Sequence, residues 1–309
     1  MDRLYYFRQF LNHFWLRPEN ALLLALRAES FKKTFNFFDD AEASIDVSCG
    51  DGVFSFIANG GQISADSDMF RSLRFGKREG DFDAFDCFDD TYKMNVIKEA
   101  DRKFKYGIDW KSSLLAKASK LNFYQNTLVH DNNNKLPFED ESFQYVYTNS
   151  AYWVAKFEEH IKDLFRITAS HGHIVLQIKT NNILQLSSRY YAPFMGEKFH
   201  TIIDAGRMST WKGLRSKEDI LNMIISFGNV DILSVEPIYG GLLARIWDIG
   251  LRPLFNPLAR MANSLSDEER VSIKKEWNEI LFDLFEESLQ KYKSSENDAI
   301  EYLIVLEKK

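Results

Sequence analysis

Cysteine is scarce in this chain. Only Cys49 and Cys87 occur among its 309 residues. Two cysteines cannot build a disulfide framework, and their spacing matches no zinc-binding pattern. This excludes a small disulfide-stabilised secreted fold, and it indicates a protein of a reducing cytosol.

Long apolar runs and a surplus of basic residues are also missing. The apolar run at residues 21–26 is far too short to cross a bilayer, and the first residues lack the layout of a signal peptide. The net charge of −6 argues against a nucleic-acid partner, because such proteins usually carry a basic surplus. No internal repeat is visible. We therefore expect a cytoplasmic globular protein, long enough to bury a substantial core.

A strand followed by a glycine turn stands near the start of the chain. Residues 44–48 read as a short buried strand, Gly50 and Gly52 follow, and an apolar helix begins after them. Glycine permits backbone angles that other residues resist, and it lets a ligand approach the bare main chain. In an open α/β sheet, the turn after the first strand binds a nucleotide-like ligand.

Strand and helix patterns alternate through the rest of the chain. Strands are predicted at residues 105–110, 127–131, 145–148, 173–178, 230–235 and 299–306. Helices are predicted at residues 112–120, 154–169 and 216–227. This alternation indicates βαβ units and a parallel sheet. Right-handed crossovers would place helices on both of its faces.

Four apolar residues recur at helical spacing before the second strand, namely Phe85, Phe88, Tyr92 and Val96, and they predict a helix. Acidic residues lie among and just before them: Asp81, Asp83, Asp86, Asp89 and Asp90. A metal site is one interpretation of these acids. A solvated helix face or helix start suits them better, because carboxylates favour that end of a helix. We therefore predict no metal site.

Helical material also flanks the sheet at both ends. Residues 1–35 predict helices, which either pack on the sheet edge or cover a ligand with Arg17 and Glu19 pointing into it. Near the other end, Ser266 with Glu269 three residues later marks the start of a long helix.

Five motifs follow one another between residues 44 and 178. The first comprises Asp46, Ser48, Gly50, Asp51 and Gly52; the others are residues 107–118, Asp131, residues 136–146 and residues 164–176. In kind and order they resemble the motifs of class I S-adenosylmethionine-dependent methyltransferases. A lone glycine motif would be weak support, whereas five elements in order are specific.

The resemblance implies a three-layer Rossmann-like α/β fold with a seven-stranded, mostly parallel sheet in the order 3-2-1-4-5-7-6 and helical insertions. It implies a single domain over residues 1–309. Within it, residues 1–40 would form an N-terminal helical cover, residues 60–103 an insertion, and residues 238–297 a helical insertion before the last strand.

The resemblance also implies a cofactor site for S-adenosylmethionine. Glycines at the first turn would admit the methionine tail and ribose, Asp109 would accept both ribose hydroxyls, and Asp131 would accept from the adenine amino group. The full set implied for the cofactor is Asp46, Ser48, Gly50, Asp51, Gly52, Asp109, Trp110, Asp131, Asn132 and Asn149. Asp109 and Asp131 could instead merely cap the helices that follow them.

The chain departs from the family's pattern at three places. Ser48 replaces the first glycine, and residues 170–172 read Ser-His-Gly where the family often has Pro-Gly-Gly. Asp109 lies 57 residues after Gly52 (109 − 52), whereas the ribose acid of dinucleotide folds lies about 20 residues on, where Asp66 and Asp68 stand. We still choose Asp109, because its strand and following helix match the family better.

Segments around the motifs resemble bacterial methyltransferases of surface polysaccharide biosynthesis. These are residues 15–19, 149–153 and 247–253. The implied acceptor is a small molecule or glycan, which could be lipid-linked, and the implied atom is a sugar hydroxyl. His200 and Tyr152 are the catalytic candidates, and Arg17, Glu19 and Trp153 the substrate-binding ones.

Two other functions were weighed against this one. A nicotinamide-dependent enzyme needs glycine or alanine where Ser55 stands, so that function is disfavoured. A catalytically silent protein that kept the fold as a binding module or scaffold is the alternative. Residues 242–265 combine apolar and arginine side chains, so they form either a lid or a peripheral contact with the inner face of the membrane. The oligomeric state is left open.

Overall fold

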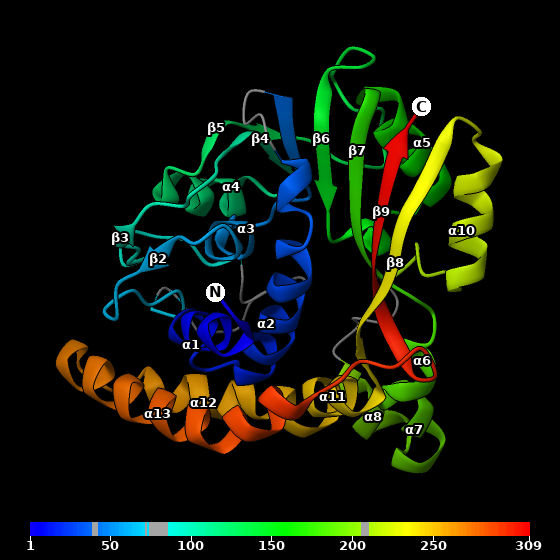
Figure 1. The fold of residues 1–309 in the computed structure, drawn as a ribbon. Coiled ribbons are helices and arrows are strands. Elements are labelled where there is room, and N and C mark those ends of the chain that lie inside the picture. The colour runs from blue at the N-terminus through cyan, green and yellow to red at the C-terminus, as the bar shows by residue number, and fades with distance from the viewer. Residues whose placement is uncertain (39–42, 72, 74–85, 205–209) are drawn as a thin grey trace.

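A seven-stranded sheet forms the centre of the computed structural model, which describes residues 1–38, 43–71, 73, 86–204 and 210–309 (Figure 1). Its strands are β1 (Ser44–Val47), β4 (Phe104–Asp109), β5 (Tyr124–Val129), β6 (Phe143–Thr148), β7 (Thr168–Lys179), β8 (Val230–Gly240) and β9 (Ala299–Lys308). Their spatial order is β5-β4-β1-β6-β7-β9-β8. The first five are parallel, and β9 runs antiparallel to β7 and β8. Counted along the chain, this order is 3-2-1-4-5-7-6, so the predicted fold class is confirmed.

Side chains alternate between the two faces of the sheet. In β6, Tyr145 and Tyr147 enter one apolar core, whereas Val146 enters the other. In β7, Val175 joins the first core, and Ile174 the second. This period of two follows from the pleat, and burial on both faces explains why these strands are almost continuously apolar.

Helices cover both faces and complete the three layers. The first core is closed by α1 (Arg3–His13), α2 (Pro18–Lys32) and α3 (Val53–Ala58). The second is closed by α5 (Phe157–Ile167) and α10 (Lys217–Ser226). Between β4 and β5 lies α4 (Ser112–Ala118). The helical N-terminal segment is therefore two helices, joined by residues 14–17.

A row of helices extends beyond the carboxyl ends of the parallel strands (Figure 1). After β7 come α6 (Ile183–Leu186), α7 (Ser188–Met195) and α8 (Glu197–Asp204). After β8 come α11 (Gly241–Arg245), the π-helical η6 (Ile246–Leu251), η7 (Arg252–Leu254), α12 (Phe255–Ala262) and α13 (Asp267–Lys291). The start of α13 is capped as predicted, because Glu269 N donates to Ser266 Oγ (3.3 Å) and Ser266 N to Glu269 Oε2 (2.8 Å).

The helix predicted from Phe88, Tyr92 and Val96 is wrong within the described residues. Residues 86–95 are mostly irregular, with a turn at residues 90–91 and a β-bridge from Lys93 to Asp68, and Val96 begins the strand β3 (Val96–Lys98), which pairs with β2 (Gln62–Ile63). Asp89 Oδ1 accepts a hydrogen bond from Thr91 N (2.8 Å), a local bond that favours a turn over a helix. The residues of the same pattern at 81, 83 and 85 lie outside the described part of the chain.

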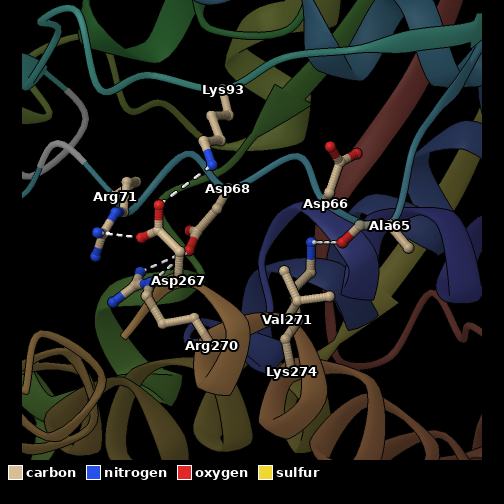
Figure 2. A pocket seen from close by; sticks show the side chains of 9 residues that line it. All are labelled: Ala65, Asp66, Asp68, Arg71, Lys93, Asp267, Arg270, Val271 and Lys274. Atoms are coloured by element: carbon tan, nitrogen blue, oxygen red, sulfur yellow. Dashed lines mark hydrogen bonds and ion pairs between the residues drawn. The ribbon is translucent and has the colours of Figure 1, made fainter. Parts of the chain in front are cut away.

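A charged hollow joins this segment to α13 (Figure 2). Asp68 accepts from Arg270 Nη2 at 2.6 Å and Nε at 2.9 Å, and Arg270 is only 3% exposed. Trp15 Nε1 donates to the other oxygen of Asp68 at 3.1 Å. Lys274 Nζ donates to the carbonyl of Ala65 at 3.0 Å. The hollow thus fixes the long helix to the N-terminal helices through buried polar bonds.

Candidate functional site

The carboxyl ends of three neighbouring parallel strands meet at one edge of the sheet. In the register, Val47 of β1 pairs with Ile108 of β4 and with Thr148 of β6. The turn at residues 48–52, Asp109 and Asn149 therefore lie at about the same level. Ligands of open α/β sheets bind at this edge, where the strand order reverses.

The turn after β1 adopts left-handed backbone angles at three positions. Gly50 has φ +60° and Gly52 has φ +74°. A Cβ on Gly52 would lie 2.8 Å from the Tyr124 ring, whereas one on Gly50 would meet nothing within 4 Å. Gly52 is thus required for packing, and the main chain at Gly50 faces open space.

Ser48 takes the angle that a glycine would take there. Its φ is +65°, a conformation that costs a non-glycine residue free energy. Its hydroxyl accepts a hydrogen bond from Asn132 Nδ2 at 2.6 Å. The departure from the glycine pattern therefore keeps the shape of the turn and adds a bond to the loop after β5.

Asp109 ends β4 beside this turn. Its Oδ2 accepts from Gly50 N and its Oδ1 from Lys111 N, both at 3.0 Å. The side chain is 6% exposed, and this burial raises the pKa of its carboxyl group although both backbone bonds oppose the shift. Each oxygen keeps a further lone pair, so the carboxylate can still accept two hydroxyl groups.

Asp46 lies beneath the turn. It is 1% exposed, and its Oδ2 accepts from Ser55 Oγ (2.5 Å) and Tyr124 OH (2.7 Å). Burial raises the pKa of this carboxyl group to about 6, against the opposing effect of both hydrogen bonds. Its described contacts join β1, α3 and β5.

We expect the free energy of unfolding to depend on pH because of this buried carboxyl group. Because the native pKa of Asp46 lies above the unfolded value, the native state holds its proton at pH values where the unfolded state releases it. The stabilisation is complete below about pH 4 and is lost as the pH rises through about 6. The asparagine of an Asp46→Asn variant does not ionise. The difference in free energy of unfolding between this variant and the wild type should therefore shift by about 2 kcal/mol in favour of the variant when the pH is raised from 4.5 to 7.5. Urea unfolding at both pH values measures this; a difference that does not change with pH would contradict it.

Asp51 lies between the two glycines of the turn. Its Oδ1 accepts from Val53 N (3.1 Å) at the start of α3, and its Oδ2 lies 3.7 Å from Nε2 of His13, which is 1% exposed. Burial would raise the pKa of Asp51, but His13 and Lys117 hold it below its usual value. The sequence did not place His13 here, because no local signal relates α1 to the turn.

The residues after β5 lie at the outer rim of this edge. Asp131 is exposed and accepts from Asn133 N at 2.9 Å. Asn132 is 9% exposed, and its Oδ1 has no hydrogen-bond partner. Trp110, at the end of β4, is 66% exposed. Among the described residues, Asn132 thus keeps an acceptor free, and the exposed ring of Trp110 has the Lys111 ammonium 5.2 Å from its centre.

Aromatic rings line the side of the edge beyond β6. Tyr152 and Trp153 follow Asn149 on η5 (Ala151–Trp153), with ring centroids 5.7 Å apart. The Trp211 ring meets both, at 5.8 and 6.0 Å, and stacks on Trp247 at 6.2 Å. We call Tyr152, Trp153, Trp211 and Trp247 the aromatic wall. The sequence predicted roles for the first two members. Trp247 begins a segment of the resemblance but was given no role at the site, and no motif pointed to Trp211.

The start of α2 overhangs the aromatic wall. The Phe31 ring packs at a tilt against Tyr147, one residue before the end of β6, and Arg27 pairs with Glu301 near the start of β9. At a rise of 1.5 Å per residue, Glu19 lies about 12 Å further along the helix axis than Arg27. Next to it, Asn20 Oδ1 accepts from Trp247 Nε1 at 2.9 Å. The helix start therefore passes beyond the sheet edge to the aromatic wall.

Arg17 and Glu19 form an ion pair at this helix start. The Arg17 guanidinium also lies 5.0 Å from the centre of the Phe255 ring. Glu19 is 1% exposed, and its Oε2 has no hydrogen-bond partner. A buried carboxylate oxygen with a free lone pair can accept a hydroxyl group of a ligand.

His200 lies on α8, in the row of helices beyond the carboxyl ends of the parallel strands (Figure 1). Among the described residues its buried Nε2 has no hydrogen-bond partner, and no described contact joins it to Asn149, Tyr152 or Trp153. Its role stays a prediction. Among the described residues, no group of three or more His, Cys, Asp or Glu side chains could hold a metal ion.

Comparison with known proteins gives one match in sequence. Residues 94–176 match the family model of a methyltransferase domain, which includes Asp109, Asp131 and Asn149 but not the turn at residues 48–52. No curated protein matches the chain.

Solved structures resemble the chain only distantly. The [4+2]-cyclase SpnF is 14% identical with a TM-score of 0.47, covering 92% of this chain and 80% of its own. A possible histamine N-methyltransferase from Thermotoga maritima is 13% identical with a TM-score of 0.45, covering 93% and 92%. A geranyl diphosphate methyltransferase in complex with S-adenosylmethionine is 13% identical with a TM-score of 0.41, covering 94% and 90%. The strand order itself defines the fold.

The strand order and the matched segment agree with each other. The match runs from just before β3 to within β7, so it includes β4 and β6, two of the three strands whose carboxyl ends form the site, but not β1. Residues 94–176 are therefore similar in sequence to a methyltransferase domain, and they lie in a sheet with the strand order that the motifs predicted.

Proposed function

We propose that the protein transfers a methyl group from S-adenosylmethionine to a hydroxyl group of a small-molecule or glycan acceptor, in the synthesis of a surface polysaccharide. The aromatic wall beside Asn149, overhung by α2, is the observation that carries this proposal. Flat rings with a few polar groups at their border suit an acceptor of the size and character of a sugar.

The residues of the strand edge suit the cofactor. The open main chain at Gly50 would receive its methionine tail, and the Asp109 carboxylate its ribose hydroxyls. Asn132, with its free acceptor oxygen, Asp131 and the ring of Trp110 would border the adenine. Asn149 would lie beside the sulfonium. When bound, the cofactor supplies an electrophilic methyl group.

The chain's own contribution would be alignment and removal of a proton. Holding two reactants in line can lower a barrier by up to about 7–11 kcal/mol in favourable systems. A sugar hydroxyl is a weak nucleophile, so a general base would assist. Tyr152 and His200 are the proposed catalytic residues, and Arg17, Glu19 and Trp153 would bind the acceptor.

Incubation with labelled S-adenosylmethionine tests the proposal. Fractionated cell glycans, nucleotide sugars and metabolites would serve as acceptors, and mass spectrometry would identify the labelled product. A methylated sugar hydroxyl is the expected result. Cofactor binding without turnover on any fraction would favour the catalytically silent binding or scaffold protein instead.

We also propose that residues 242–265 touch the inner face of the membrane, where a lipid-linked glycan would be met. Leu242, Leu254 and Met261 are 63%, 49% and 67% exposed, and Arg245 and Arg260 are exposed beside them. Trp247 and Phe255 face inward, which favours the lid over the membrane contact for those two side chains. Among the described helices, none is long and apolar enough to cross a bilayer. Failure to co-sediment with anionic liposomes would remove this part of the proposal.

A further inference from the structure

Lys179 ends β7 inside the aromatic wall. Its Nζ lies 4.8 Å from the ring centre of Tyr152, 5.1 Å from that of Trp247 and 5.4 Å from that of Trp211. The side chain is 2% exposed. A lysine ammonium is strongly hydrated, and its removal from water costs free energy unless polar partners replace the water.

Those partners are few. Among the residues that the structure describes, the ammonium makes one hydrogen bond, to Tyr152 OH at a long 3.4 Å. An ammonium has three donors, so two remain without an acceptor. The nearest carboxylate oxygen, Glu301 Oε2, is 3.9 Å away, beyond hydrogen-bond distance.

Glu301 is already neutralised by another residue. Arg27 donates to both of its oxygens, with Nη2 at 2.5 Å from Oε2. Burial would raise the pKa of Glu301, but Arg27 and Lys179 hold it below its usual value, so it stays ionised. The three charges of Arg27, Glu301 and Lys179 therefore sum to one positive charge in a buried place.

The place of this charge connects it with the acceptor. Leu176 of β7 pairs with Thr148 of β6, so Lys179 lies three residues, about 10 Å, beyond that level. Tyr152, its one hydrogen-bond partner among the described residues, lies three residues after Asn149 in the chain. The ammonium thus lies on the acceptor side of the strand edge, behind rings on which a sugar could pack.

We propose that Lys179 and the rings around it bind an anionic group of the acceptor, a phosphate or a carboxylate. This inference rests on the proposed function and names its substrate class: the acceptor is an anionic sugar derivative rather than a neutral one. Two oxygens of the anion would accept the two free N–H groups, and the anion would neutralise the buried charge. Charge-assisted bonds of this kind are the stronger ones in proteins.

A binding experiment tests the subsite without any turnover. The indole N–H signals of Trp211 and Trp247 would be followed by NMR while inorganic phosphate or acetate is added, and Trp→Phe variants would assign them. Both signals should move in the wild type with at least one anion, and which anion moves them separates a phosphate from a carboxylate. Lys179→Met should weaken this binding by at least about tenfold, whereas Lys179→Arg, which keeps the charge, should retain part of it.

Control variants separate this role from a structural one. Lys162→Met removes an exposed lysine of α5 that pairs with Glu158, and it should leave anion binding unchanged. Methionine is apolar and of similar length, so it should fit between the rings; if Lys179→Met does not fold, Lys179→Gln replaces it. Wild-type signals that do not move with either anion would overturn the proposal.

A second measurement applies to the acceptor itself. Once a labelled product is found, Lys179→Met should raise the acceptor KM by at least about tenfold, with the affinity for S-adenosylhomocysteine within about twofold of wild type. Loss of cofactor affinity with an unchanged acceptor KM would assign the anion to the cofactor's own carboxylate and overturn the proposal. If no acceptor is methylated but phosphate binds at Lys179, the proposed function fails while the subsite stands.

Discussion

Replacing Asp109 with asparagine is expected to weaken the binding of S-adenosylmethionine by about 100-fold. The substitution keeps the shape of the side chain but replaces one carboxylate oxygen with an amide nitrogen, which cannot accept a ribose hydroxyl. Hydrogen bonds to a charged group contribute about 1.5–3 kcal/mol each, and tenfold in affinity corresponds to about 1.4 kcal/mol. Isothermal titration calorimetry with the purified protein measures the loss.

S-adenosylhomocysteine separates a ribose effect from one at the methyl group. It lacks the transferred methyl group but keeps the ribose, so its binding should fall by the same factor. Asp231→Asn, at an exposed position of β8, is the matched control and should leave both affinities unchanged. Since Asp109 also accepts from Gly50 N, thermal unfolding must confirm that the variant is folded. A folded Asp109→Asn protein with wild-type affinity would show that the ribose is held elsewhere.

Replacing Arg270 with methionine is expected to lower the free energy of unfolding by about 3–5 kcal/mol. The substitution leaves the carboxylate of Asp68 in the charged hollow without its buried counter-charge (Figure 2). Trp15 Nε1 and Phe70 N would still donate to Oδ1, so the loss falls on Oδ2. Urea unfolding followed by circular dichroism measures the change.

A double variant separates the contribution of the ion pair from the cost of leaving the Asp68 carboxylate buried without a partner charge. Asp68→Asn combined with Arg270→Met removes both charges, so it should be more stable than Arg270→Met alone. Lys291→Met, on the same helix, removes one member of an exposed ion pair with Glu287 and should cost less than about 1 kcal/mol. An Arg270→Met protein as stable as the Lys291→Met protein would show that the buried pair does not hold α13 in place.

Local patterns predicted much of the fold. The strands from β4 to β9 and the helices α4, α5, α10 and α13 were expected near their observed positions, because alternating apolar residues and capping residues act over a few neighbours. The helices α6, α7 and α8 were not predicted. The capping box at Ser266 and Glu269 is an example, since both partners lie within one turn. The predicted helix around Phe88 and Tyr92 failed for the same reason. Its apolar spacing is helical, but Val96 pairs with Ile63, a residue far away in sequence.

The residues of the candidate site also fall into two groups, those that the sequence predicted and those that only the structure brought to the site. The turn with Gly50 and Gly52 and the acids Asp109 and Asp131 follow strands, so their order along the chain was enough to select them. The sequence did not select four further residues, because a contact with a residue on another element is what places each of them at the site: His13, Trp211, Trp247 and Lys179. Asp46 was selected for the cofactor, yet its described bonds are to Ser55 and Tyr124.

By itself, the sequence determined the glycine turn and, through its resemblance to a known family, the sheet order, since both depend on motifs that are contiguous in the chain. Only the tertiary structure decided what surrounds the acceptor side of the turn. The start of α2, the rings of residues 152, 153, 211 and 247, and the ammonium of Lys179 come together there from distant segments. The physical reason is that each of these contacts is made across the fold, between side chains whose spacing in the sequence carries no information about their distance in space.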